Sequence, residues 1–174
     1  TFTAPGSITQ NNTITATNSV ALTSTGAGVN LGANVQATDP GGSVSVSAFN
    51  GITSASASYL IADNVSLTST NADVSLTTPL SATNSITLDG KTGVSTTGLL
   101  STAALTVSGG TGGISITDTT ATTLRANAKG NISINDSASS GVVNLKASAS
   151  TTGTLSVTLN GATSLNVAEA ISGT

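Results

Sequence analysis

Short apolar units recur along the chain at intervals of roughly 20 residues, a spacing typical of repeat folds. Each unit places two apolar residues on either side of one polar or small residue, as in Val44-Ser45-Val46. This alternation is typical of a β-strand that buries one face. The units of this series begin at Val20, Val44, Val65, Ile86, Leu105, Leu124, Val143 and Leu165, so their spacing varies only slightly.

Two further series of apolar residues lie between these units. The stronger one keeps a similar spacing and consists of Ile8, Val29, Ile52, Val74, Val94, Ile114, Ile132 and Leu155. The weaker one consists of Val35, Leu60, Leu80 and Leu100, after which small residues take over. Each period therefore contains two strong apolar positions and one weak one.

This repeat predicts an all-β fold, a parallel β-helix in which each period forms one coil. One coil cannot bury its apolar face alone, but stacked coils share a continuous core and pair each strand with its equivalent. We therefore predict a right-handed β-solenoid of about eight coils of roughly 20 residues, with residues 1–174 as a single segment. Two tandem β-sandwiches are the alternative, but they need a thick core of large side chains, and the chain has two Phe and one Tyr.

The residues between the predicted strands are suited to tight corners. Gly-rich stretches such as residues 109–113 precede several strands and tolerate positive φ. Four Asn residues also stand just before strands, and one interpretation is a hydrogen-bonded ladder of stacked Asn side chains; the other is that Asn is simply a good turn residue. These residues are Asn18, Asn64, Asn84 and Asn131.

The stretch from Ser47 to Ala62 alternates poorly and contains Phe49 and Tyr59, two of the three aromatic residues. Residues 39–42, Asp-Pro-Gly-Gly, form a strong turn signal just before it. We favour a longer coil whose aromatic side chains fill a wider corner. A protruding loop with a contact role is the alternative.

The composition excludes several classes of function. The chain has no His, Cys, Met or Trp, 6% charged residues and a net charge of −3. Common zinc and copper sites, Ser-His-Asp triads and thiol nucleophiles therefore have no residues to form them. Four basic residues are too few to neutralise a run of phosphates, so nucleic acid is not an expected partner. No apolar run is long enough for membrane insertion. We predict no cofactor and leave any binding residues unassigned.

The acidic residues occur singly, mostly at predicted turns, and we interpret them as solvated rather than as paired catalytic carboxylates. Asp73 and Asp118 each flank a strand, but in different coils. We therefore predict no catalytic residue and no enzymatic activity. The seven acidic residues are Asp39, Asp63, Asp73, Asp89, Asp118, Asp136 and Glu169.

Three other motifs carry little weight. The stretch at residues 109–114 resembles a calcium-binding solenoid repeat, but Ile114 stands where the Asp ligand belongs, so no metal site is expected. Thr residues do not repeat at the coil period, which disfavours an ice-binding face. Glycosylation acceptor patterns arise readily in a chain this rich in Ser and Thr; they begin at Asn11, Asn64, Asn131 and Asn135.

The coil length and the Gly and Asn turns resemble the repeat region of filamentous haemagglutinin-type adhesins, exoproteins of Gram-negative bacteria often exported by two-partner secretion. The residues that carry this resemblance include Gly113-Ile114-Ser115-Ile116-Thr117 and Gly130-Asn131-Ile132-Ser133-Ile134. The family's Asn-Pro-Asn secretion motif is missing, because no Asn-Pro occurs in the chain. Its Arg-Gly-Asp binding motif is also missing, because the only Arg is Arg125 and Ala126 follows it.

The resemblance implies a repeat segment from the shaft of a secreted or surface-exposed adhesin that supports attachment or biofilm, with host-cell or surface glycans or proteins as partners. The first residue, Thr1, is not an initiator Met, so we expect a fragment of a much longer repetitive exoprotein. Two alternatives stay open: a subunit of a self-assembling extracellular filament or matrix fibre that associates head to tail, and a carbohydrate-active β-helix.

Overall fold

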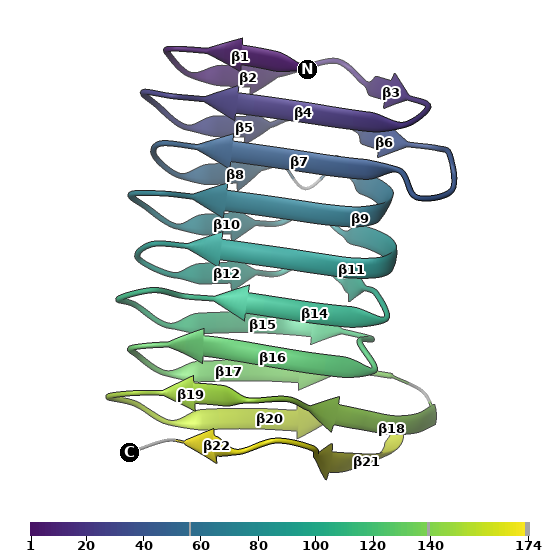
Figure 1. Ribbon diagram of the computed structural model, residues 1–174, viewed down its shortest axis with the longest axis vertical. Coiled ribbons are helices and arrows are strands. Elements are labelled where there is room, and N and C mark those ends of the chain that lie inside the picture. Colours follow the sequence, from purple (N-terminus) through teal and green to yellow (C-terminus); the bar gives the residue numbers. More distant parts are fainter. Residues whose placement is uncertain (56, 139, 173–174) are drawn as a thin grey trace.

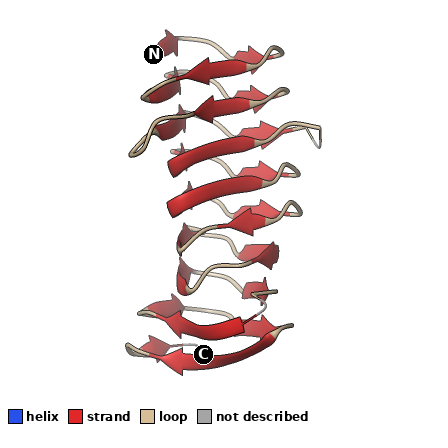
Figure 2. Cartoon of the chain, turned by 90° about the vertical axis from the view of Figure 1, so that its right-hand side faces the viewer, coloured by secondary structure: helices blue, strands red, loops and turns tan. Residues whose placement is uncertain are grey.

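The computed structural model describes residues 1–55, 57–138 and 140–172, and none of these is helical. The chain forms a parallel β-solenoid of about eight coils with roughly 21 residues each (Figure 1). The nearer strands run one way and the return strands run the other way behind them as the chain descends, so the winding is right-handed. Seen from the side, the stack consists of strands and loops alone (Figure 2).

The strands form three faces, named here the long, serine and short faces. The long face comprises β1 (Phe2–Ala4), β4 (Ser19–Ser24), β7 (Ser43–Ala48), the second parts of β9 (Leu60–Ser69) and β11 (Leu80–Gly90), β14 (Ala104–Ser108), β16 (Thr123–Ala128), the ends of β18 (Ser140–Leu145) and β21 (Ala162–Val167), and β19 (Ser148–Ser150) and β22 (Ile171–Ser172). The serine face comprises β2 (Ile8–Gln10), β5 (Val29–Leu31), β8 (Ile52–Ser54), β10 (Val74–Leu76), β12 (Val94–Thr96), β15 (Ile114–Thr119), β17 (Ile132–Asp136) and β20 (Leu155–Leu159). The short face comprises β3 (Ile14–Ala16), β6 (Val35–Ala37), the first parts of β9 and β11, β13 (Leu100–Ser101) and the last residues of β15, β17 and β20.

The register confirms the predicted repeat on the serine face in full. Each predicted apolar residue from Ile8 to Leu155 is the direct partner of the next one along the stack. Ile52 and Val74 in this column are completely buried. Because strand side chains alternate between faces, the residues beside them point outward. One inner column of the solenoid is thus built from a single recurring sequence position.

On the long face the predicted series holds as far as Leu124 and then shifts by two residues. Leu124 pairs with Leu145 rather than with Val143, so this one step is displaced. The last predicted step is correct, because Val143 pairs with Leu165. A shift of two residues keeps the same side of the strand inward. The apolar-x-apolar unit alone therefore left two possible registers, and the prediction chose the wrong one.

The short face changes character along the stack. Val35, Leu60, Leu80 and Leu100 are successive partners, as predicted, and all are buried. The next two partners in this column are the fully buried polar residues Thr119 and Asp136. The sequence prediction of small residues here missed that their polar groups lie inside.

Buried serine side chains shape the corner between the long and serine faces. The Ser69 hydroxyl donates to the Asn50 carbonyl oxygen, one coil earlier, at 2.9 Å and accepts from the amide of Ala72 at 3.2 Å. Ser24 and Ser150 each make the same pair of bonds in other coils. These hydroxyls stabilise the turn and connect neighbouring coils, because each bonds within its own turn and to the coil before it.

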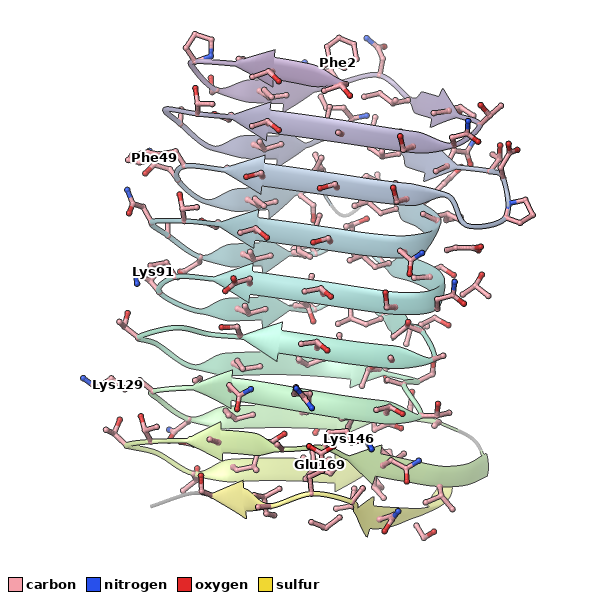
Figure 3. All side chains as sticks on the ribbon, in the orientation of Figure 1. Phe2, Phe49, Lys91, Lys129, Lys146 and Glu169 are labelled. Carbon is pink, nitrogen blue, oxygen red and sulfur yellow. The ribbon has the colours of Figure 1, made fainter. Side chains whose placement is uncertain are left out.

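The irregular stretch is a longer coil, but Phe49 does not fill a corner. Its side chain is 44% exposed at the edge of the stack (Figure 3), so that part of the interpretation is wrong. Tyr59 is partly buried, and its carbonyl oxygen accepts from the amide of Val35. The interior here is occupied by Ser58, which is buried and bonds to the Ala55 carbonyl oxygen at 2.7 Å. Ser56 lies outside the described residues.

Candidate functional site

The outer side of the serine face carries a straight column of hydroxyl groups. Register pairing aligns Ser75, Ser95, Ser115, Ser133 and Ser156 in successive coils, and all five are exposed. Neighbouring strands in a sheet are about 4.8 Å apart, so the hydroxyl groups recur at that spacing. Such a row offers weak, uncharged hydrogen-bonding groups to a polar surface.

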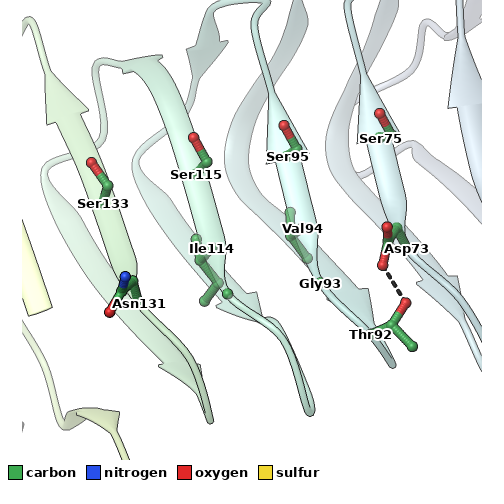
Figure 4. Close-up of a pocket in the computed structure, with 11 residues that line it drawn as sticks. Asp73, Ser75, Thr92, Gly93, Val94, Ser95, Ile114, Ser115, Asn131 and Ser133 are labelled. Carbon is green, nitrogen blue, oxygen red and sulfur yellow. Dashed lines mark hydrogen bonds between the residues drawn. The ribbon is translucent and has the colours of Figure 1, made fainter. Parts of the chain in front are cut away.

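A shallow groove of about 440 Å³ runs beside this column, across β10, β12, β15 and β17 (Figure 4). Asp73 contributes its one carboxylate, and the Thr92 hydroxyl donates a hydrogen bond to that carboxylate from the next coil. Asn131 contributes an amide at the far end, where its Oδ1 accepts from the amide of Thr154 at 3.0 Å. A lone carboxylate already bonded to a threonine has no partner carboxylate for general acid–base chemistry.

The predicted acidic residues lie in different settings. Asp39 is exposed in a turn, as predicted, and Asp73 is exposed just before β10. Asp63 lies within β9 and accepts a hydrogen bond from the amide of Gly41 at 2.5 Å. That bond lowers the pKa of Asp63, with a second hydrogen bond from Thr83 acting in the same direction.

Asp136 is the clear exception to the prediction of solvated turn residues. It lies within β17 and its exposed fraction is 0%. Burial is the main cause that raises the pKa of Asp136, and the charge of Asp118 in the preceding coil adds to it. The interval between the two residues in the sequence corresponds to one coil, and this interval is the signal by which the pair could have been found.

Charged side chains form one small cluster on the long face near the C-terminal end. Glu169 lies 3.4 Å from Arg125 and 3.5 Å from Lys146, in two different preceding coils. Figure 3 shows Lys146 and Glu169 one above the other on this face. It also accepts from the amide of Ala147, and this bond, followed by the two cations, lowers the pKa of Glu169. The cluster connects three coils across an exposed surface.

The four predicted Asn residues do not form a ladder. Asn64 pairs in register with Ser43 and Ser85, and the Ser85 hydroxyl donates to its side chain at 2.9 Å. One step of such a ladder exists elsewhere, where Asn166 donates to the Asn144 side chain at 2.8 Å. Of the two interpretations, the ladder is therefore wrong, because turn propensity does not specify which corner column a residue enters.

The structure also places the calcium-like stretch and the threonine residues that the sequence analysis considered. Ile114, which replaces the calcium ligand, is buried in the core. Within the described ranges, no three acidic side chains lie close enough together to hold a metal ion. Thr87 and Thr106 are register partners on the long face, but the next outward residue in their column is Arg125.

Comparisons of the chain with protein-family models, with curated proteins and with solved structures found no match. No membrane-spanning helix occurs among the residues that the structure describes. The class of protein is therefore defined by the fold itself, a parallel β-solenoid with a polar, weakly charged outer surface.

Proposed function

We propose that this chain is a non-enzymatic structural shaft segment of a bacterial surface-exposed or secreted adhesin. The observation that carries the proposal is the continuous parallel register of the serine face from Ile8 to Leu155. A ladder of this kind forms a rigid rod, because backbone hydrogen bonds hold each coil at a fixed position relative to the next. The resemblance to filamentous haemagglutinin-type repeats supports the adhesin context.

The outer surface supports the same role. Serine and threonine hydroxyls dominate the outward columns, and the chain carries four basic and seven acidic residues. Small polar side chains cover a rod without giving it strong affinity for one ligand, which suits a spacer that holds other modules away from a surface. In this proposal, surface glycans or proteins of a host contact other parts of the adhesin.

Deletion of one complete coil tests whether the chain is a modular shaft. Removal of residues 74–93 joins two equivalent positions, because Val74 and Val94 are register partners. We expect the shortened chain to fold and its axial length to fall by about 4.8 Å in small-angle X-ray scattering. Removal of residues 74–83, about half a coil, is the control and should disrupt the fold.

Binding and activity assays test the non-enzymatic part of the proposal. We expect the purified chain to show no saturable binding to a glycan array and no cleavage of bacterial or plant polysaccharides. Saturable binding that is lost on substitution of Asp73 or Ser95 would make the groove a ligand site. Polysaccharide cleavage would instead favour a carbohydrate-active β-helix.

Self-assembly into a filament is a second candidate, and the two ends of the stack favour it. Phe2 is 63% exposed at one end, and Val167 and Ile171 are 51% and 45% exposed at the other. Apolar hollows of about 380 and 490 Å³ lie at these two ends. If the chain is a fibre subunit, sedimentation should reveal concentration-dependent oligomers, and Phe2→Lys with Val167→Lys should dissolve them.

A further inference from the structure

The buried column of the short face contains one ionisable side chain. Leu100 is followed in this column by Thr119, then by Asp136, and then by Leu159 of β20. Thr119 and Asp136 both have exposed fractions of 0%. A carboxylate in such a position loses its hydration, and burial of a charge is costly unless bonds or counter-charges replace the water.

Asp136 repeats the turn geometry of Thr119 one coil later. The Thr119 Oγ1 accepts from the amide of Ala121 at 3.3 Å, and the Asp136 Oδ1 accepts from the amide of Ala138 at 2.9 Å. Thr119 also donates its hydroxyl hydrogen to the Leu100 carbonyl oxygen at 2.8 Å. The second carboxyl oxygen of Asp136, Oδ2, is buried and has no hydrogen-bond partner among the described residues.

The charges around Asp136 do not compensate for its burial. Asp118 on β15 adds a second negative charge nearby, and its carboxylate accepts from the Ser137 hydroxyl. On β16, the one charged residue is Arg125, which is exposed on the outside and paired with Glu169. β20, packed on the other side, contains no titratable residue. Desolvation is accordingly the main cause that raises the pKa of Asp136, and the bond from Ala138 opposes it.

We propose that Asp136 is a pH-dependent weak point of the stack, at which β17 and β20 open locally when the carboxyl group is ionised and stay closed when it is protonated. The elements beyond this point have the features of low local stability. Leu155, Val157 and Leu159 are only partly buried, as are Ile8 and Ile14 at the other end of the stack, whereas the apolar residues of their columns in the coils between are buried. Regions with little buried apolar area open at lower free energy than the rest of a fold.

The direction of the effect follows from proton linkage. A carboxyl group whose pKa is raised by folding binds more protons in the native state than in the unfolded chain. Its favourable contribution is complete below the unfolded pKa, near 4, and is lost as the pH rises through the folded pKa. Asp63 and Glu169 have lowered pKa values and act in the opposite direction, losing their contribution in acid.

Amide hydrogen exchange of the complete chain tests this proposal. Protection of β17 and β20 is compared between the wild type and Asp136→Asn, first near pH 7 and then below about pH 4. Because both proteins share all other titrating groups, the ratio of their protection isolates Asp136. We expect Asp136→Asn to gain protection relative to wild type as the pH rises, while β4 to β12 keep the same ratio throughout.

Asp136→Thr, which copies Thr119, provides a second neutral variant should the asparagine be tolerated poorly. The criterion is the change of the ratio with pH, so a uniform loss of stability in either variant does not hide the effect. Asp118→Asn should reduce the pH dependence of wild-type protection without abolishing it. The proposal is overturned if the protection ratio of β17 and β20 stays constant with pH for both neutral variants.

Discussion

The first five coils and the last three solve the same packing problem with different side chains. In the first part, the short-face column is filled by Leu60, Leu80 and Leu100, and the long-face strands β9 and β11 continue around the corner from it. In the last part, Thr119 and Asp136 occupy the column, and β18 and β19 divide the long face. A solenoid core is thus specified column by column, and a column can turn polar when local hydrogen bonds replace apolar contacts.

The largest effect is expected from substitutions that create a cavity in the core, and it should differ between the two parts of the stack. Leu80 is 1% exposed in the middle of the column, so Leu80→Ala should lower the free energy of unfolding by about 2–5 kcal/mol. Leu159→Ala removes the same atoms from a partly buried position and should cost distinctly less. Denaturant unfolding measures both, and equal losses would contradict the difference in packing.

A smaller effect tests whether hydrogen bonds hold the polar part of the column. Thr119→Val keeps the side-chain shape but leaves the Leu100 carbonyl and the Ala121 amide without the hydroxyl. We expect a loss of about 1–3 kcal/mol, the usual cost of unsatisfied buried polar groups. Thr106→Val, on the exposed outer side of β14, is the matched control and should be near neutral. A stabilised Thr119→Val would mean that apolar filling is the stronger requirement here too.

The corner serines allow the same substitution in both parts of the molecule. Ser69→Ala and Ser150→Ala each remove one bond to the preceding coil and one within the turn. Each should cost about 1 kcal/mol, a typical value for a lost hydrogen bond. The methyl group fits, because Ala48 and Ala128 are the register partners of Ser69 and Ser150. Thermal unfolding of the two variants should therefore shift by similar amounts.

The smallest effect is expected at the charged cluster of the last coils. Glu169→Gln removes the ion pairs with Arg125 and Lys146, but all three side chains are substantially exposed and solvent screens the interaction. Because the pKa of Glu169 is lowered, its contribution exists near neutral pH and disappears as acid protonates it. The free energy of unfolding should differ slightly between low and high salt for the wild type, and it should differ less for the variant.

The sequence predicted the solenoid because recurrence of apolar residues is a global property that survives local exceptions. The serine-face series from Ile8 to Leu155 was correct at every step. The shift at Leu145 was missed because two adjacent apolar-x-apolar registers are equivalent in alternation.

The buried polar groups were harder to predict because they have no periodic signal. Asp136 follows Ile132-Ser133-Ile134, and alternation places it on the inner side with Ile132 and Ile134 once the strand extends to it, but the prediction treated it as a turn residue. The sequence likewise does not distinguish the buried corner serines from the many serines that point outward. Phe49 misled the prediction because large aromatic residues are usually buried, whereas here the core is too thin to receive one.

The axial spacing of the coils is the most direct test of the stacked ladder. Thr9 and Ser156 occupy the same outward column, seven register steps apart. The native chain has no Cys, so spin labels on Thr9→Cys and Ser156→Cys report this one distance by pulsed electron resonance. The stack predicts a narrow distribution near about 34 Å, with allowance for the label arms. A distance below about 20 Å, or a broad distribution, would contradict a continuous parallel solenoid.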